Sequence, residues 1–237
     1  HTDSSAASDV YKRQAMGRET TASEYGSTAM GEGTTASGNY STAMGYSTRA
    51  SGSVSVAMGN TTIASGNFST DMGQLTTAIG DYSTAIGDNT IASGSRSTTM
   101  GYSTRASGGI STAMGNTTIA SGFASTTMGQ LTTASGNYST AMGLSTTASD
   151  YNSLVLGQWN LAGSTTTNSP TEFSTDNTAF VIGNGLSWDN RSDALVVNFN
   201  GDATLAGNLN INSDARLKAN IVSLGSTLSK LLQIDGK

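Results

Sequence analysis

The sequence predicts an all-β protein, a parallel β-roll (solenoid) with coils of 14 residues, and three observations lead to this prediction. A glycine recurs at every seventh residue from Gly31 to Gly143, and Glu24 and Asp150 are the gaps on either side before Gly157 closes the series. The residue before each glycine alternates between Met or Ile and, mostly, Ser, so the true period is 14. No apolar period near 3.6 residues appears, and the density of Gly, Ser and Thr disfavours helix. Such strict spacing indicates a chain that turns at fixed intervals.

Each coil has two unlike halves of seven residues. One half reads like Asn39-Tyr-Ser-Thr-Ala-Met-Gly45, and the next reads like Tyr46-Ser-Thr-Arg-Ala-Ser-Gly52. Seven residues suit a strand of about five residues and a two-residue turn, with glycine at the tight corner. We therefore expect two strands per coil and a thin roll with two faces.

A longer echo is laid over this pattern. Residues 46–80 resemble 102–136 at an offset of 56 residues, which is four coils. Arg49 and Arg105 recur at equivalent places, where solvated side chains are expected. Ile79 breaks the alternation, because it puts an apolar residue into a Ser half.

Alternation along each strand assigns the side chains to faces. Ala and Gly share one face in both halves, which predicts a narrow lumen lined by Ala, Gly and Ser. The outer face of one strand then carries Thr42 with Met44, and the outer face of the other is polar, as with Arg49 and Ser51.

Three residues are unusual for such a lumen. Asp71, Thr99 and Thr127 fill an Ala slot at intervals of 28 residues. An ionised carboxylate there is costly unless it is hydrogen-bonded or wet. Two explanations stay open: the lumen holds water near Asp71, or the two faces are assigned in reverse.

A stripe of methionines runs along one outer wall. All nine methionines of the chain occupy the slot before glycine, and Ile86 takes it once. Burying each such side chain is worth roughly 1.5–3 kcal/mol, and a long exposed apolar patch marks an interface. We therefore expect identical rolls to pack Met wall against Met wall. The residues expected at this interface are Met30, Met44, Met58, Met72, Ile86, Met100, Met114, Met128 and Met142.

The pattern also divides the chain into segments. Residues 1–14 do not fit the repeat and are taken as a leader that need not be native, and 15–160 are expected to form the roll. Residues 161–178 are rich in Gly, Ser, Thr and Asn and predict a linker, and 179–212 predict a β-rich neck. Trp159 and Trp188, on either side of the linker, are expected to cover the end of the roll or the neck.

The coils resemble the head repeats of trimeric autotransporter adhesins of the YadA type. Ser55-Val-Ala-Met-Gly59 and Ser83-Thr-Ala-Ile-Gly87 come closest to the Ser-Val-Ala-Ile-Gly pattern of that family, and the resemblance covers roughly 15–160. It implies left-handed parallel β-rolls that associate as a homotrimer about a threefold axis, in agreement with the Met-wall argument. This chain departs from the family in using Met for Ile and Thr for Val.

A second resemblance lies near the C-terminal end. Ser213-Asp-Ala-Arg-Leu-Lys-Ala-Asn-Ile221 is similar to the start of the self-cleaving intramolecular chaperone domain of phage endosialidases, tail fibres and some bacterial surface fibres. The resemblance implies that Ser213 severs the bond before it and that Lys218 is its base, with 213–237 a truncated start of this domain. Lysine acts as a base where desolvation lowers its pKa, and we expect this stretch to be too short for that. The alternative is that Ser213 caps a helix and Lys218 is solvated.

Composition excludes several functions. A net charge of −5 with only 11% charged residues leaves no electrostatic footprint for nucleic acid. The chain has no cysteine and its one histidine is His1, which disfavours Ser–His catalysis and Cys- or His-ligated metals. No cofactor or metal is expected, and no segment reaches the ~20 apolar residues that span a membrane.

The leading prediction is an extracellular, non-enzymatic role as the rod of a trimeric cell-surface adhesin or a phage tail fibre. The C-terminal chaperone domain would assist trimer folding, and the partner on the host, a matrix protein or a glycan, is not encoded in a readable motif. One alternative is an ice-binding β-solenoid, which thermal hysteresis would reveal. Another is a tailspike-type enzyme whose catalytic part is missing, since no paired carboxylates of a cleft are found.

Overall fold

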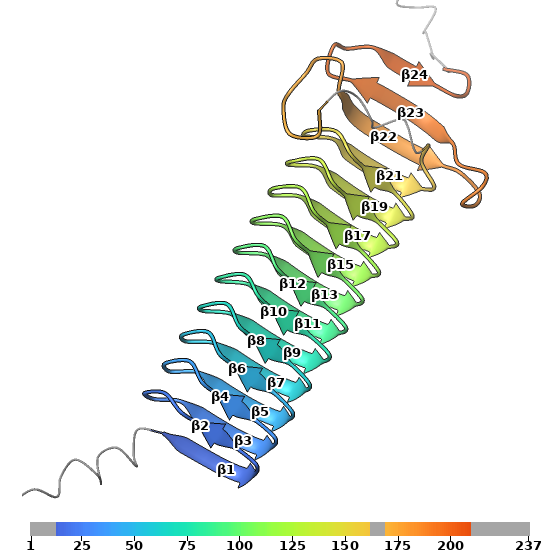
Figure 1. Ribbon diagram of the computed structural model, residues 1–237. Helices are drawn as coiled ribbons and strands as arrows, with labels where there is room; N and C mark the ends of the chain where they lie inside the picture. The colour runs from blue at the N-terminus through green and yellow to red at the C-terminus, as the bar shows by residue number, and fades with distance from the viewer. Residues whose placement is uncertain (1–12, 162–168, 210–237) are drawn as a thin grey trace, which may run out of the picture. The chain divides into compact units, whose positions relative to one another are not determined.

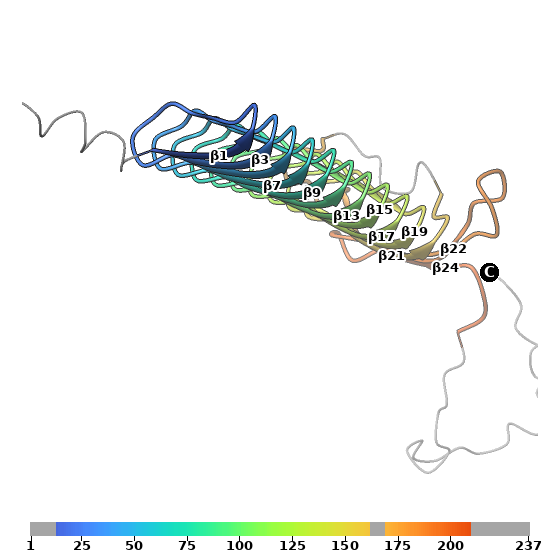
Figure 2. The ribbon, with the colours of Figure 1, turned by 90° about the horizontal axis from the view of Figure 1, so that it is seen from below.

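The structure is a computed structural model that describes residues 13–161 and 169–209, and every element in these residues is a strand. Two sheets face each other across a narrow interior, and successive coils stack in register (Figure 1). One sheet has 14 strands and is parallel except at its last two strands, and the other has 10 parallel strands. Seen from below, the coils lie one behind another with a flattened cross-section (Figure 2). The predicted all-β solenoid with 14-residue coils is therefore confirmed.

The 14-stranded sheet holds the longer strands. Eleven of them, all five residues long, are parallel and alternate in sequence with the strands of the other sheet. They are β1 (Gln14–Arg18), β3 (Thr28–Glu32), β5 (Thr42–Tyr46), β7 (Val56–Asn60), β9 (Thr70–Gln74), β11 (Thr84–Asp88), β13 (Thr98–Tyr102), β15 (Thr112–Asn116), β17 (Thr126–Gln130), β19 (Thr140–Leu144) and β21 (Leu154–Gln158).

The 10-stranded sheet is made of two-residue strands. They are β2 (Thr21–Ala22), β4 (Thr35–Ala36), β6 (Arg49–Ala50), β8 (Ile63–Ala64), β10 (Thr77–Ala78), β12 (Ile91–Ala92), β14 (Arg105–Ala106), β16 (Ile119–Ala120), β18 (Thr133–Ala134) and β20 (Thr147–Ala148). The prediction of a five-residue strand in both halves is thus wrong for the Ser half. There the Ser-Gly pair turns the chain early: the Gly52 carbonyl accepts hydrogen bonds from both the amide and the hydroxyl of Ser55.

The interior is lined by small residues, as predicted. From Ala29 to Ala148 the strand alanines of both sheets, such as Ala43 and Ala50, are fully buried, whereas Thr42 and Met44 are half-buried and face outward. A column of buried threonines, including Thr48, joins the Ala and Ser of the lumen and was not predicted. Gly45 was expected inside and is exposed: it lies within β5, but its φ of 122° departs from the extended conformation, so the strict alternation of side chains fails there.

From Tyr40 onward, each corner of the coils places a residue other than glycine in the left-handed region, and Gly26 and Gly33 take the same position nearer the N-terminus. Tyr40, Ser47 and Val54 have φ of 56°, 51° and 57°, and the same position recurs every seven residues. The left-handed turn lets the amide donate to the preceding coil, as from Val54 to the Asn39 carbonyl at 2.7 Å. For a β-branched residue this conformation costs roughly 1–2 kcal/mol, which the coil-to-coil hydrogen bond helps to offset.

The glycines are required because the coils approach each other closely there. A Cβ atom on Gly52 would collide with the carbonyl oxygen of Gly66 in the next coil, and the same is true of Gly45 and Gly59. Gly45 has in addition a φ of 122°, which side-chain-bearing residues rarely adopt. The seven-residue spacing of glycine is therefore the spacing of backbone contacts between coils.

Side chains close the end of the 10-stranded sheet. The Asn160 amide accepts a hydrogen bond from the Thr147 amide (2.8 Å) and donates to the Thr147 carbonyl (3.1 Å), where the next coil would otherwise pair. The Arg191 guanidinium lies over the Trp159 ring at 5.1 Å and donates to the Ser145 carbonyl. Trp159 thus takes part in the end of the roll, as predicted, whereas Trp188 is 74% exposed and does not cover it.

The 14-stranded sheet continues past that point. The strand β22 (Thr178–Asn184) pairs in parallel with β21, and β23 (Asp193–Asn198) and β24 (Ala203–Leu205) follow as an antiparallel meander. Val155 and Val181 are fully buried here and replace the alanines of the coils. The segment expected to form a β-rich neck therefore begins with a further rung of the same sheet. All described strands lie in one compact unit that ends at Ala206.

The contact between coils predicts that a methyl group is not tolerated at a stacked glycine. Gly94→Ala, at an ordinary φ, would place its Cβ against the Gly108 carbonyl oxygen, so we expect a loss of stability on the order of 2–3 kcal/mol. Gly109→Ala is the matched control, because its Cβ would meet only the Phe123 ring at 3.4 Å. Urea unfolding followed by circular dichroism measures both. Equal midpoints for the two variants would contradict this account.

Candidate functional site: a methionine stripe on one wall

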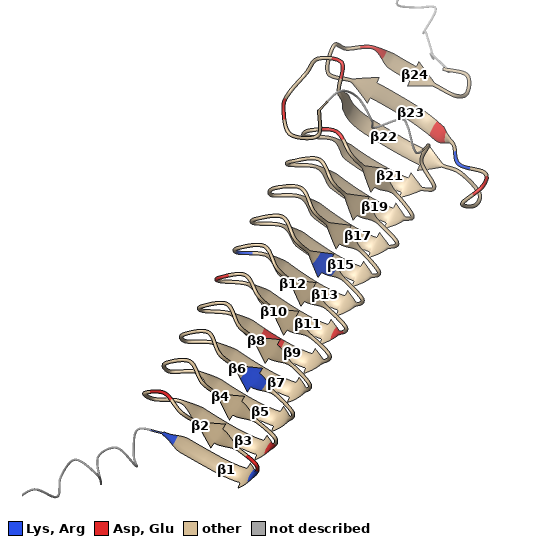
Figure 3. Ribbon diagram, in the orientation of Figure 1, with Lys and Arg blue, Asp and Glu red and all other residues tan. Residues whose placement is uncertain are grey.

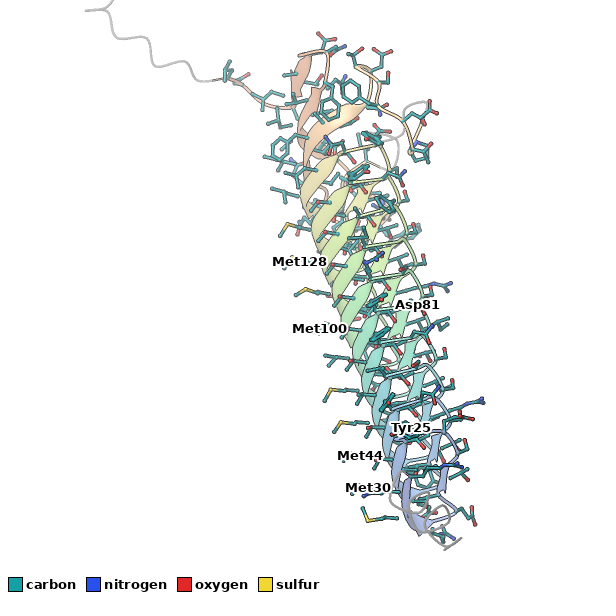
Figure 4. The ribbon with its side chains drawn as sticks, turned by 90° about the vertical axis from the view of Figure 1, so that its left-hand side faces the viewer. Tyr25, Met30, Met44, Asp81, Met100 and Met128 are labelled. Atoms are coloured by element: carbon teal, nitrogen blue, oxygen red, sulfur yellow. The ribbon has the colours of Figure 1, made fainter. Side chains whose placement is uncertain are left out.

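The stripe of methionines lies on the outward face of the 14-stranded sheet, which we call the Met wall. Pairing in register places Met44 beside Met30 and Met58, and Ile86 beside Met72 and Met100. The side chains project from one side of the roll, away from Asp81 and Tyr25 (Figure 4). The sequence prediction of one continuous apolar row is therefore confirmed for the geometry, and its role as an interface stays a prediction.

The stripe is only partly covered within one chain. Met72, Met100 and Met128 are 37%, 41% and 36% exposed, and the other members between Met30 and Met142 are half-buried by their neighbours in the row. A half-buried row of threonines, interrupted by Val56, runs beside it. Each side chain of the Met wall is thus shielded by the rungs before and after it, and its outward side is open.

The outward face of the 10-stranded sheet, which we call the short-strand wall, has a different character. Its slots are filled by Thr, Ser, Arg and Ile, such as Thr35, Arg49 and Ile63. Charged side chains are sparse along both walls (Figure 3), and Arg18 forms an ion pair with Glu32 at the first rungs.

Asp71 lies fully buried in the lumen, so the face assignment is correct and its reversal is excluded. The Oδ2 atom accepts a hydrogen bond from the Ile63 amide at 2.6 Å, across the lumen in the other sheet. Burial raises the pKa of the Asp71 carboxyl to about 6, and the neighbouring Thr76 hydroxyl and Ile63 amide oppose this rise only in part. Two features make the buried Asp71 carboxyl tolerable: the hydrogen bond from the Ile63 amide, and the raised pKa, which favours the neutral form. Thr99 and Thr127 are buried in the same slot, as predicted.

A ladder of aromatic side chains along one corner was missed by the sequence prediction. The rings of Phe68 and Tyr82 stack with centroids 5.0 Å apart, and the Arg96 guanidinium lies 5.4 Å from the Tyr82 centroid. Tyr25 and Tyr40 pack edge to face nearer the N-terminus. These residues stand 14 or 15 apart, and all but Tyr25 take the second position after a glycine; that spacing was the available signal.

The predicted catalytic pair, Ser213 and Lys218, lies outside the described residues, so the two side chains are not placed together. Within residues 13–161 and 169–209, no three His, Asp or Glu side chains gather as metal ligands. The same residues contain no helix long and apolar enough to cross a membrane.

Comparison with known families finds a similarity in the coils. The family profile of the YadA head domain repeat (2 copies) matches five segments, namely 22–48, 50–70, 78–104, 120–146 and 134–158. These segments lie within the stacked coils, whose β-roll architecture and 14-residue coil agree with the match. No match was found among curated proteins.

Asp71 predicts an unusual pH dependence of stability. A carboxyl whose pKa is raised in the folded state binds its proton more tightly there than in the unfolded chain, where the pKa is 3.8. Its contribution is therefore most favourable below 3.8 and is lost as the pH rises through about 6, by up to about 3 kcal/mol.

Asp71→Ala introduces the residue that the neighbouring coils have at this slot, Ala57 and Ala85, and removes the pH-dependent contribution of the carboxyl to stability. We expect the variant to gain stability over the parent at pH 7.5 and to gain much less at pH 4. Urea unfolding of both proteins at the two pH values measures the difference, in which other titrating groups cancel. A constant gain or loss across pH would refute the predicted pKa.

Proposed function

We propose that this chain, whose solenoid is built of YadA head domain repeats, is the rod-like head of a homotrimeric adhesin displayed outside the cell. The observation that carries the proposal is the Met wall, a row of apolar side chains left about two-fifths exposed at its most open positions. Eleven five-residue rungs at about 4.8 Å each span roughly 50 Å. Such a rod holds binding surfaces away from the point at which it is anchored.

Self-association is the expected way to cover the Met wall. The nine members from Met30 to Met142 are partly shielded already, so covering the rest is worth on the order of 5–10 kcal/mol per chain. The lumen of Ala, Ser and Thr supplies little apolar burial of its own. The family resemblance supports three copies about one axis, with the Met walls facing inward and the short-strand walls facing out.

The function proposed is structural and adhesive, with no catalytic step in the coils. An ice-binding role is disfavoured on the short-strand wall, where the outward slot changes from Thr35 to Arg49 to Ile63, so no flat rank of threonines forms. The proposal needs no cofactor or metal.

The trimer and its interface are tested together by light scattering on the purified chain. We expect a mass of three copies of the 24.0 kDa chain. Met100→Asp with Met114→Asp should dissociate or unfold the rod, because an ionised carboxylate in an apolar contact is costly. Met100→Ile with Met114→Ile is the matched control and should stay trimeric, since Ile86 already occupies the slot. A trimer undisturbed by the two aspartates would rule out the Met wall as its interface.

The C-terminal motif carries a second, separable proposal. If 213–237 begin a chaperone domain that assists trimer folding, a chain extended through that whole domain should be cut before Ser213. Mass spectrometry should then find a fragment that starts at Ser213, and Ser213→Ala should abolish it. Release of the same fragment from the alanine variant would contradict the assignment of the nucleophile.

A further inference from the structure

Isoleucines replace polar residues near the middle of the short-strand wall, and one more, Ile119, lies a rung beyond Arg105. The first residue of each two-residue strand faces outward, and we call it the first outward slot. Over the five successive strands from β6 to β14 this slot holds Arg49, Ile63, Thr77, Ile91 and Arg105, each paired in register with the next. An apolar centre is therefore bounded by an arginine at each end. Both arginines are exposed, and Ile63 is 38% exposed.

The second outward slot of the same wall strengthens this centre. In the coils on either side it holds Ser65 and Ser93, but in the middle coil it holds Ile79, which is 50% exposed. Ile79 is the residue that broke the alternation in the sequence. A single exposed isoleucine would be ordinary, but several of them gathered between two arginines mark a contact surface. We call Arg49, Ile63, Ile79, Ile91 and Arg105 the Arg–Ile patch.

Its dimensions fit an extended chain. Four rungs at about 4.8 Å separate the two arginines by about 19 Å. In an extended peptide, every second side chain faces the same way and advances about 6.7 Å, so residues i and i+6 are about 20 Å apart. Acidic side chains at i and i+6 can reach both arginines, while those at i+2 and i+4 lie over the isoleucines.

We propose that the Arg–Ile patch binds an extended acidic polypeptide segment that runs along the rod, with Asp or Glu at both ends and aliphatic side chains between them. Charge complementarity selects the ends. In the part of the chain that the structure describes, neither Arg49 nor Arg105 forms an ion pair, so both guanidinium groups are open to an outside carboxylate. The isoleucines favour a peptide over an acidic glycan, because a sugar chain offers no aliphatic side chains to cover them.

The patch lies on the wall opposite the Met wall, so both surfaces can be occupied at once. The inference names a partner for the proposed adhesive role and rests on that role. The variants that change the patch leave the Met wall as it is, so a failure of this proposal is distinguishable from a failure of the trimer.

The test uses the full 237-residue chain flowed over the peptide Glu-Thr-Val-Thr-Val-Thr-Glu, immobilised densely so that several weak contacts act together. Arg49→Thr with Arg105→Thr introduces the residue of other coils at these slots, such as Thr35 and Thr77. We expect it to weaken binding about five- to tenfold. Ile79→Ser introduces the serine found at the equivalent position of the preceding coil, Ser65, and should weaken binding about threefold.

The controls separate the patch from general stickiness. Ile119→Thr, one rung beyond Arg105, should leave binding unchanged, and so should Met100→Ile on the other wall. A peptide with Gln at both ends, or with its two acids moved to i and i+2, should bind several-fold more weakly. Absence of saturable binding to the first peptide would overturn the proposal. So would binding of a sulfated polysaccharide at least as tight as that of the peptide and insensitive to Ile79→Ser.

Discussion

Close contact between the backbones of successive coils is the constraint on which the rest of the structure depends. Where Gly45, Gly52 and their equivalents lie, the next coil passes so near that no Cβ fits between them. That approach sets the seven-residue spacing, forces the turns and keeps the rungs in register for the hydrogen bonds between coils. The same approach leaves a lumen too thin for large side chains, so the interior holds Ala, Ser and Thr.

Because the interior is thin, most large apolar side chains lie on the outer walls. Among the residues that the structure describes, Val155 and Val181, at the end of the coils, are the only large apolar side chains that are fully buried. Methionine and isoleucine stand on the outer walls, where neighbouring rungs cover them in part. Stability in such an array is a sum over neighbouring coils, and association can supply what the lumen does not. The two walls differ in residue type, which allows one to meet identical chains and the other to meet different partners.

Much of the fold was predictable from the sequence, because each coil repeats the same pattern of strands and turns. The glycine spacing predicted the solenoid, and strand alternation predicted the buried Ala43 and the outward Met44 correctly. Strand length was not predictable in the same way: both halves contain seven residues, yet the Ser-Gly pair turns the chain after two strand residues. Gly45 was misplaced for a different reason: it lies within β5, but its positive φ breaks the alternation of the strand. The left-handed residues, such as Val54 and Tyr40, escaped prediction because β-branched and aromatic residues are poor candidates for positive φ.

The Met wall is a different case: its pattern was readable from the sequence, whereas what covers it stays a proposal, because a single chain leaves it partly open. The Asp71 site shows the reverse: its oddity was visible in the sequence, but the partner that makes it tolerable, the Ile63 amide, appears only when the two sheets face each other. The aromatic corner ladder needed the coil geometry before residues 14 or 15 apart could be recognised as neighbours.

The Asn160 side chain has a consequence for how such proteins change in length. By satisfying the amide and carbonyl of Thr147, it acts as a stopper on one sheet, so a second molecule finds no free edge there on which to add a strand. Whole coils can be duplicated upstream of this stopper without altering it, because each new coil meets only copies of itself. The echo between 46–80 and 102–136 is what such a duplication of four coils would leave behind. The length of the rod could then change in steps of about 4.8 Å for each inserted coil.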